Sequence, residues 1–251
     1  SSLKGALRFR ASQVLNDNKK LVNVFGADSQ SEDTFAGAIM ISDAKLLLLP
    51  VRSLNGYFKW VTCPALLRRY ANDCERAGVN AENLANLNLN INQTEVLVVE
   101  NKSDKLFLEE FLLSVKVDNT LQAVAKFIAE NFKLDETAVN EQLAVVSDDM
   151  FTYLAQNSTP VNAHIALDEN KTVKKGALWY EETLPSDTVM YSLISCTSSR
   201  GKKEDKLEPQ QVADVLTGEV LPQDNRYLQV GGNETVGMGW FAVQFSQQAA
   251  Q

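Results

Sequence analysis

Apolar residues recur every three or four positions in five stretches of the chain, and this spacing predicts α-helices. Ser2 can cap the first stretch, and the second has Pro64 at its first position and Gly78 just past its end. Proline is favoured at the start of a helix and glycine after its end. The predicted helices are residues 2–14, 64–77, 119–131, 148–156 and 208–216.

Shorter apolar or alternating runs between these stretches predict β-strands. Single strands are expected at residues 38–42, 45–51, 57–61, 143–146 and 188–197. Runs on either side of polar turns predict three hairpins, formed by 96–100 with 105–115, by 161–167 with 172–180, and by 226–230 with 240–245. Pro50 has no N–H for a strand ladder, so we expect it to end its strand or to lie on a sheet edge. Residues 80–93 have no clean period and are expected to be a loop. Because hairpins outnumber β-α-β units, the pattern favours an α+β fold with antiparallel pairs and helices on one face of the sheet.

A glycine-rich segment lies between the last two predicted strands, at residues 231–239 (Gly-Gly-Asn-Glu-Thr-Val-Gly-Met-Gly). Glycine is needed where φ is positive or where another chain approaches the backbone closely. The segment is therefore either a plain hairpin loop or a surface at which the backbone contacts a ligand. It lacks the Gly-Lys-Ser/Thr of a phosphate-binding loop and precedes a strand, so we expect no nucleotide or other organic cofactor.

Composition and charge exclude several classes of protein. The chain has 251 residues, 45% hydrophobic residues and a net charge of −8, which argues against nucleic-acid binding over a broad basic surface but leaves a local basic groove possible. We expect no membrane association, because no apolar run approaches the ~18 residues of a membrane helix. The odd, scattered set of three cysteines predicts reduced buried thiols in a cytoplasmic protein, without a structural zinc site.

Few side chains could carry catalysis alone. His164 is the one histidine of the sequence, so a Ser-His-Asp hydrolase is disfavoured and His164 is expected to be structural or on the surface. Glu181 and Glu182 are adjacent acids at the end of a predicted hairpin, which face solvent or lie beside a bound strand. At the first helix, Lys4 and Arg8 share a face near the free N–H groups, which suits a phosphate as well as an ordinary solvated face.

Several motifs together resemble one known family, the RAMP superfamily of RNA-binding proteins from CRISPR systems. The resemblance starts at residues 1–8 (Ser-Ser-Leu-Lys-Gly-Ala-Leu-Arg) and includes the glycine-rich segment 231–239. Residues 43–53 (Asp-Ala-Lys-Leu-Leu-Leu-Leu-Pro-Val-Arg-Ser), 57–64 and 176–185 (Gly-Ala-Leu-Trp-Tyr-Glu-Glu-Thr-Leu-Pro) are similar to one branch, the fourth subunit of the type III-B Cmr complex.

The resemblance implies a modified RRM-like (ferredoxin-like) palm with an antiparallel sheet, helices on one face and an inserted thumb hairpin. It implies one such domain over residues 1–251, with the thumb at about 164–182. It also implies that copies of the subunit stack in a helical filament along the CRISPR guide RNA, beside other Cmr subunits, and cut the paired target RNA at regular intervals.

The implied site divides into residues that hold RNA and residues that cut it. Those expected to contact RNA are Ser1, Ser2, Lys4, Arg8, Arg52, Gly231, Gly232, Gly237 and Gly239. Glu181 or Glu182 matches an acidic thumb residue implicated in the cut, either as a metal contact or by positioning the 2′-hydroxyl that attacks the adjacent phosphate. A divalent metal ion, Mg²⁺ by expectation, is implied for this step.

In the family, the motif of residues 1–8 follows a first strand and a loop with the catalytic aspartate. The sequence begins at the motif, so we expect the complete protein to include residues before Ser1. The main hypothesis is a subunit that holds guide RNA and cuts the target; the alternative is a non-catalytic scaffold subunit that binds guide RNA. A protein that processes precursor guides would need a histidine near the first helix, and His164 lies far from it in sequence.

Overall fold

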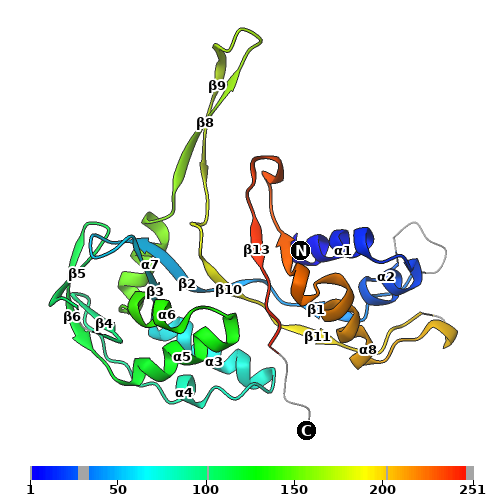
Figure 1. The fold of residues 1–251 in the computed structure, drawn as a ribbon, viewed down its shortest axis with the longest axis horizontal. Coiled ribbons are helices and arrows are strands. Elements are labelled where there is room, and N and C mark those ends of the chain that lie inside the picture. Colours follow the sequence, from blue (N-terminus) through cyan, green and yellow to red (C-terminus); the bar gives the residue numbers. More distant parts are fainter. Residues whose placement is uncertain (1, 28–33, 101, 202, 247–251) are drawn as a thin grey trace. The chain divides into compact units, whose positions relative to one another are not determined.

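The computed structural model describes residues 2–27, 34–100, 102–201 and 203–246, which form two compact units. The first unit takes the chain up to Lys45 and from Tyr191 onward, and the second takes Leu46–Met190. Figure 1 shows the ribbon with its element labels. Among the described residues, no helix has the length and apolar character that crossing a bilayer requires.

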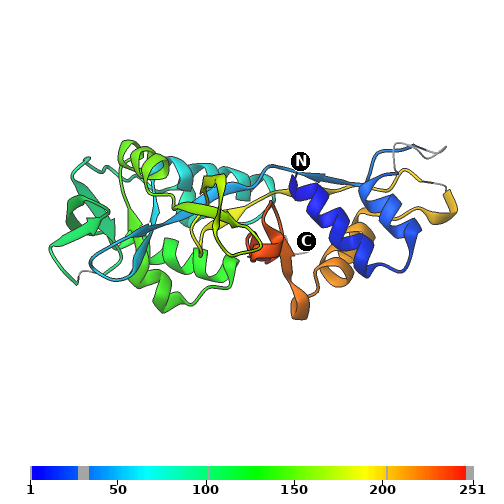
Figure 2. The ribbon, with the colours of Figure 1, turned by 90° about the horizontal axis from the view of Figure 1, so that it is seen from above.

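The first unit consists of helices and two small antiparallel sheets. Its elements are α1 (Ser2–Val14), α2 (Asn18–Phe25), β1 (Ile39–Ile41), β11 (Ile194–Cys196), η1 (Lys203–Asp205), α8 (Pro209–Asp214), the π-helical η2 (Val215–Val220), η3 (Gln223–Asn225), β12 (Tyr227–Gln229), η4 (Glu234–Val236) and β13 (Trp240–Ala242). Strand β1 pairs with β11, and β12 pairs with β13. Helices α1 and α2 lie side by side (Figures 1 and 2). The buried core of this unit includes Leu7, Ala11, Ile39, Val212 and Leu228.

The second unit is built on a seven-stranded sheet. Its elements are β2 (Lys45–Arg52), β3 (Phe58–Thr62), α3 (Pro64–Arg76), α4 (Glu82–Ala85), β4 (Glu95–Val98), β5 (Lys105–Leu108), β6 (Phe111–Val117), α5 (Thr120–Phe132), α6 (Glu136–Gln142), β7 (Leu143–Val145), α7 (Asp148–Asn157), β8 (Val161–Leu167), β9 (Val173–Glu182) and β10 (Val189–Tyr191). The strand order is β10-β2-β3-β7-β4-β6-β5, while β8 and β9 form a separate hairpin.

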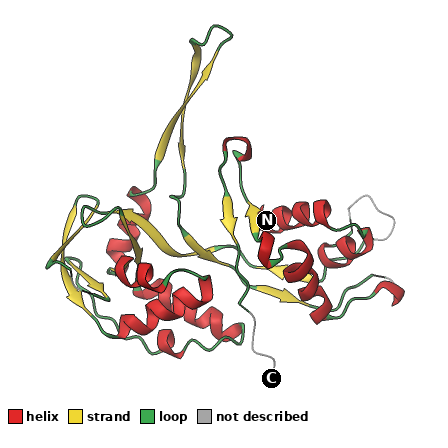
Figure 3. Cartoon of the chain, in the orientation of Figure 1, coloured by secondary structure: helices red, strands yellow, loops and turns green. Residues whose placement is uncertain are grey.

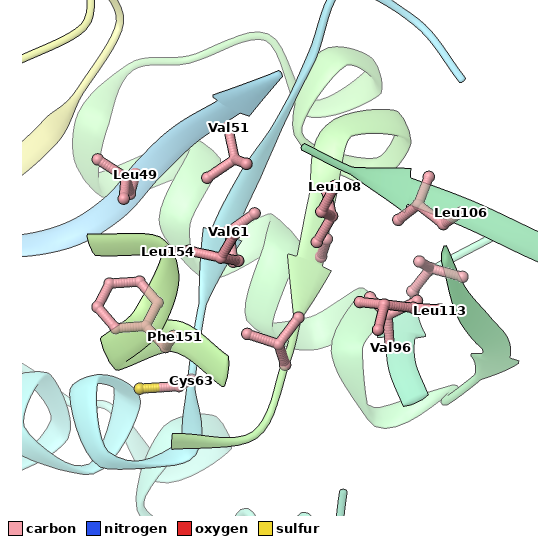
Figure 4. Packing of buried hydrophobic residues seen from close by; sticks show 13 residues of the cluster. Leu49, Val51, Val61, Cys63, Val96, Leu106, Leu108, Leu113, Phe151 and Leu154 are labelled. Atoms are coloured by element: carbon pink, nitrogen blue, oxygen red, sulfur yellow. The ribbon is translucent and has the colours of Figure 1, made fainter. Parts of the chain in front are cut away.

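Helix α7 closes one face of the large sheet. Its Phe151 and Leu154 belong to one buried cluster with residues of six strands, among them Leu49, Val61 and Leu108 (Figure 4). Strand residues alternate between faces, and Leu48 beside Leu49 is also fully buried. The sheet is therefore covered on both faces where β2 crosses it, which explains the four consecutive leucines of this strand.

The α+β class is confirmed, but the sheet is mixed rather than purely antiparallel. Strand β3 runs parallel to β7, and β4 runs parallel to β6. The predicted pairing of 96–100 with 105–115 as one hairpin is wrong, because 105–115 breaks at Glu109, whose φ is 49°. The hairpin is β5–β6.

Two further predictions on strands need correction. Strand β2 continues two residues beyond Pro50, which pairs with Trp60 inside the sheet, so Pro50 does not end the strand. The predicted strand 188–197 divides into β10 and β11, because the N–H of Leu193 donates to Ser42 Oγ at 2.9 Å, outside the strand ladder.

The predicted helices are confirmed, and the sequence pattern missed three short ones. Helix α2 is capped by Asp17, whose side chain accepts from the N–H of Lys19 at 2.8 Å. Helix α6 is capped by Asp135 in the same way, and α4 lies inside the segment expected to be a loop. Helices α4 and α6 are too short to have a strong period, whereas α2 has apolar residues at helical spacing that the sequence reasoning overlooked.

Candidate functional site

The hairpin β8–β9 extends from the second unit as a two-stranded sheet of its own (Figure 3). It confirms the predicted pair of strands around residues 168–171. The register pairs Asn162 with Glu181 and His164 with Trp179, and it shifts between Ile165 and Leu167. Gly176, with φ of 79°, lies on the strand opposite this irregularity. A two-stranded hairpin has no core of its own, so both of its faces are available for contacts.

One face of this hairpin carries exposed apolar side chains. The side chains of Ile165, Leu178 and Tyr180 share this face, because their positions alternate with those of His164, Trp179 and Glu181. Each of these three residues is more than half exposed. Such a row on an isolated hairpin suits contact with a partner molecule better than contact with water.

The opposite face holds a cluster of His164, Trp179 and Glu181. The rings of His164 and Trp179 stack with centroids 5.5 Å apart and planes 15° apart. His164 Nε2 lies 3.3 Å from Glu181 Oε2. This is an ion-pair distance, but its alignment falls short of a hydrogen bond, and the Nε2 atom is shielded from solvent. We expected His164 to be structural or on the surface. The structure shows in addition that it lies against Glu181, a candidate catalytic acid.

Glu182 faces away from this cluster. Its Oε1 accepts a hydrogen bond from the Thr159 hydroxyl, and Glu182 pairs with Val161 on the apolar face. Neighbouring residues of a strand point to opposite faces, so the two glutamates do not converge on one point. No group of three His, Cys, Asp or Glu side chains suited to a metal ion occurs among the described residues. The donors present in the described part of the chain therefore do not fit a complete metal site.

The first helix holds the next group of predicted residues. Ser1 lies outside the described residues, and Ser2 lies within the first turn of α1 rather than at its cap. Lys4 Nζ donates to the carbonyl of Ile39 at 3.3 Å, and Arg8 donates to the carbonyl of Gly26 at 2.7 Å. Both cations are half-buried and help to join α1 to its neighbours. An ammonium carries three N–H donors and a guanidinium five, so each cation can contact a phosphate in addition to a protein partner.

Arg52 belongs to the second unit and is paired there. Its guanidinium contacts both carboxylate oxygens of Glu109, at 3.1 and 2.7 Å. The Glu109 carboxylate raises the pKa of the Arg52 side chain. The Glu109 carboxylate offsets the positive charge of the Arg52 guanidinium, on which the prediction of RNA binding rested. Arg52 is therefore a weaker candidate for an RNA contact than predicted.

The glycine-rich segment forms the connection between β12 and β13. Gly231, Gly237 and Gly239 all have positive φ, whereas Gly232 does not. Asn233 also has positive φ, and its carbonyl accepts from the N–H of Met238 at 3.1 Å. The loop is therefore an ordered turn with a specific backbone geometry. This geometry favours a defined contact surface over a flexible linker.

Two exposed aromatic residues in this hairpin were missed by the sequence reasoning. Tyr227 and Trp240 lie on the outward face of β12–β13, 54% and 56% exposed, while Leu228 on the inward face is buried. Strand alternation around Leu228 could have identified them. Exposed aromatic rings on a sheet are suited to stacking on RNA bases.

Comparison with known proteins places the chain in a family. Residues 1–242 match the RAMP superfamily. The CRISPR system Cmr endoribonuclease Cmr4 of Pyrococcus furiosus is 37% identical over 249 residues, which cover 96% of this chain and 81% of that protein. The chain belongs to the Cmr4 family of RAMP proteins.

Other relatives agree with this family. The CRISPR system CMR subunit Cmr4 of Saccharolobus solfataricus is 24% identical, over 95% of this chain and 81% of that protein. A crystal structure of oligomeric Cmr4 from P. furiosus superposes with a TM-score of 0.71 at 32% identity, covering 95% of this chain and 82% of the other. A chain in a type III-B Cmr-beta complex bound to cognate target RNA has a TM-score of 0.67 at 20% identity, over 97% of this chain and 82% of the other, and supports the fold.

Proposed function

We propose that this protein is a backbone subunit of a type III-B Cmr complex, which binds CRISPR guide RNA and cuts the paired target RNA at regular intervals. The observation that carries the proposal is the 37% identity, over nearly the whole chain, to a protein named as a Cmr endoribonuclease. The oligomeric P. furiosus structure supports the assembly of several copies with one another. The three cysteines are free thiols, which is consistent with a cytoplasmic protein because the cytoplasm keeps thiols reduced.

The first unit is the part that we assign to the guide. The N-terminal end of α1, Lys4, Arg8 and the backbone N–H groups of residues 231–239 supply donors for phosphates. Phosphate contacts have no base identity, so the subunit accepts any guide sequence. Tyr227 and Trp240 add surfaces on which bases can stack without regard to sequence.

The β8–β9 hairpin is the part that we assign to the thumb. Its exposed Ile165, Leu178 and Tyr180 form a wedge of apolar side chains. Apolar wedges separate stacked bases in other nucleic-acid complexes. A thumb inserted between guide and target would flip out one nucleotide in each copy and set the interval between cuts.

Glu181 and Glu182 are the residues that we assign to the cut. Because they face opposite sides of β9, we expect one of them to act, and we favour Glu181 for its contact with His164. Its carboxylate would accept a hydrogen bond from the 2′-hydroxyl and orient that oxygen toward the adjacent phosphorus. The 2′-oxygen forms the new bond to phosphorus as the bond from phosphorus to the 5′-oxygen of the next nucleotide breaks. The proton of the 2′-hydroxyl passes to water, and the leaving 5′-oxygen takes up a proton from water.

A divalent ion, Mg²⁺ by preference, would neutralise charge on the scissile phosphate when bound. The described residues do not supply its ligands, so no step of this proposal depends on it.

The test is to purify the protein with its bound RNA and to incubate the complex with a matching target, with and without Mg²⁺. We expect co-purified guide RNA and cutting of the target, and the comparison of the two conditions measures how far the rate depends on Mg²⁺. Bound guide without any cutting would support the scaffold alternative. Absence of bound RNA would refute both.

A further inference from the structure

His164 and Glu181 come from different strands of the β8–β9 hairpin, and the register brings them together. Glu181 pairs with Asn162, and His164 pairs with Trp179, so His164 and Glu181 are diagonal neighbours on one face. Diagonal neighbours in an antiparallel pair are within reach of long side chains. Here the imidazole Nε2 lies 3.3 Å from the nearer carboxylate oxygen.

Two features restrict the imidazole. The stacked Trp179 ring, 5.5 Å away and nearly parallel, fixes the plane of the His164 ring. The Nε2 atom is shielded from water and has no aligned hydrogen bond. A shielded polar atom without an aligned partner is costly, and native proteins retain few of them. The ring edge is therefore directed at the Glu181 carboxylate.

We propose that His164 is a positioning residue for Glu181, an inference that rests on the function proposed above. The imidazole lies against one carboxylate oxygen of Glu181 and keeps the carboxylate in the orientation in which it accepts the hydrogen bond of the target 2′-hydroxyl. A slight movement of the carboxylate on binding RNA aligns the contact. The Trp179 stack keeps the imidazole from turning away.

Glu182 provides an internal comparison. Its carboxylate is held on the other face of the hairpin by the Thr159 hydroxyl, from the segment before β8. The two acids are thus oriented by different partners. Loss of the imidazole N–H affects Glu181 and leaves the environment of Glu182 intact.

The test compares two substitutions of His164 in the guide-loaded complex. His164→Phe keeps a flat ring on Trp179 but removes the N–H, whereas His164→Gln loses the ring but keeps an amide N–H at a similar reach. His164→Phe should slow single-turnover target cutting about two- to fivefold, which is the loss expected for one partly exposed polar contact. His164→Gln should cut at close to the wild-type rate, and target-RNA affinity should stay within about twofold for both variants.

Three results would overturn this inference: His164→Phe cuts as fast as wild type, His164→Gln loses as much as His164→Phe, or affinity falls in parallel with the rate. Glu181→Ala, assayed alongside, distinguishes a failure of the proposed role of Glu181 from a failure of the positioning role of His164. If Glu181→Ala cuts normally, the proposed role of Glu181 fails and the inference fails with it. If Glu181→Ala is severely impaired while His164→Phe is not, Glu181 keeps its role and only the inference fails.

Discussion

The glycine-rich loop allows a sharp prediction, because its glycines differ in what a methyl group would meet. At Gly239 an added Cβ would lie 2.3 Å from the carbonyl oxygen of Val230. That oxygen belongs to rigid backbone, and the N–H of Val230 donates to the carbonyl of Gly239 at 2.8 Å. At Gly232 an added Cβ would meet nothing within 4 Å, and φ there is not positive.

The cost of Gly239→Ala follows from these numbers. A non-glycine residue at positive φ costs about 1–2 kcal/mol. Relief of the overlap with Val230 breaks the closing hydrogen bond of the hairpin, for about 1 kcal/mol more. The total of about 2–3 kcal/mol should appear as local opening of β12–β13, whereas Gly232→Ala should cost less than about 0.5 kcal/mol.

Hydrogen exchange over residues 227–242 measures this difference directly. Protection should fall by about 30-fold or more in Gly239→Ala, since 1.4 kcal/mol corresponds to a tenfold change, and stay unchanged in Gly232→Ala. Gly239→Ala should also bind guide RNA more weakly. Equal protection in the two variants would refute the account of the loop as a defined surface.

Three further predictions concern the second unit. Single variants, compared in a single-turnover assay, should separate the roles of the two acids. Glu181→Ala should slow target cutting about 100-fold or more, as expected for a group that acts on the attacking hydroxyl, while Glu182→Ala should change the rate less than about tenfold. The reverse order would transfer the role to Glu182. Hydrogen bonds from Thr172, first from its hydroxyl and then from its N–H, lower the pKa of Asp168 at the hairpin tip. Their contribution is present above the unfolded pKa of about 3.9 and is lost as pH falls through the lower folded value. ¹⁵N relaxation should therefore find a more ordered tip in wild type than in Asp168→Asn at pH 6, and the difference should shrink once the pH falls below the unfolded pKa. Burial raises the pKa of the Cys63 thiol to about 12, so iodoacetamide at pH 8 should label Cys63 only after unfolding, and rapid labelling of the folded protein would contradict its burial.

The sequence predicted the β8–β9 hairpin well because its signals are local. Asp168 accepts hydrogen bonds from the N–H groups of Asn170 and Thr172, which is the turn chemistry that its residue type favours. The opposite orientations of Glu181 and Glu182 also follow from strand alternation alone. The break at Glu109 could not be predicted, because a glutamate rarely adopts positive φ without a tertiary reason.

The contacts of the candidate site depended on tertiary structure and were out of reach of the sequence. Which residue faces Glu181 depends on the register of the hairpin, and that register contains an irregularity near Ile165. The partners of Lys4 and Arg8 are carbonyl groups of residues more than fifteen positions away. Periodicity identifies the face of a helix on which a cation lies, but it does not identify the acceptor that the cation meets.

The central claim, that this subunit cuts guided target RNA at regular intervals, can be tested in one measurement. An end-labelled target is incubated with the guide-loaded complex, and its fragments are sized beside those from the Glu181→Ala complex. We expect a ladder of products separated by one constant interval, and this ladder should be absent or strongly reduced with Glu181→Ala. An intact target, or cuts at irregular positions that are the same in both complexes, would contradict it.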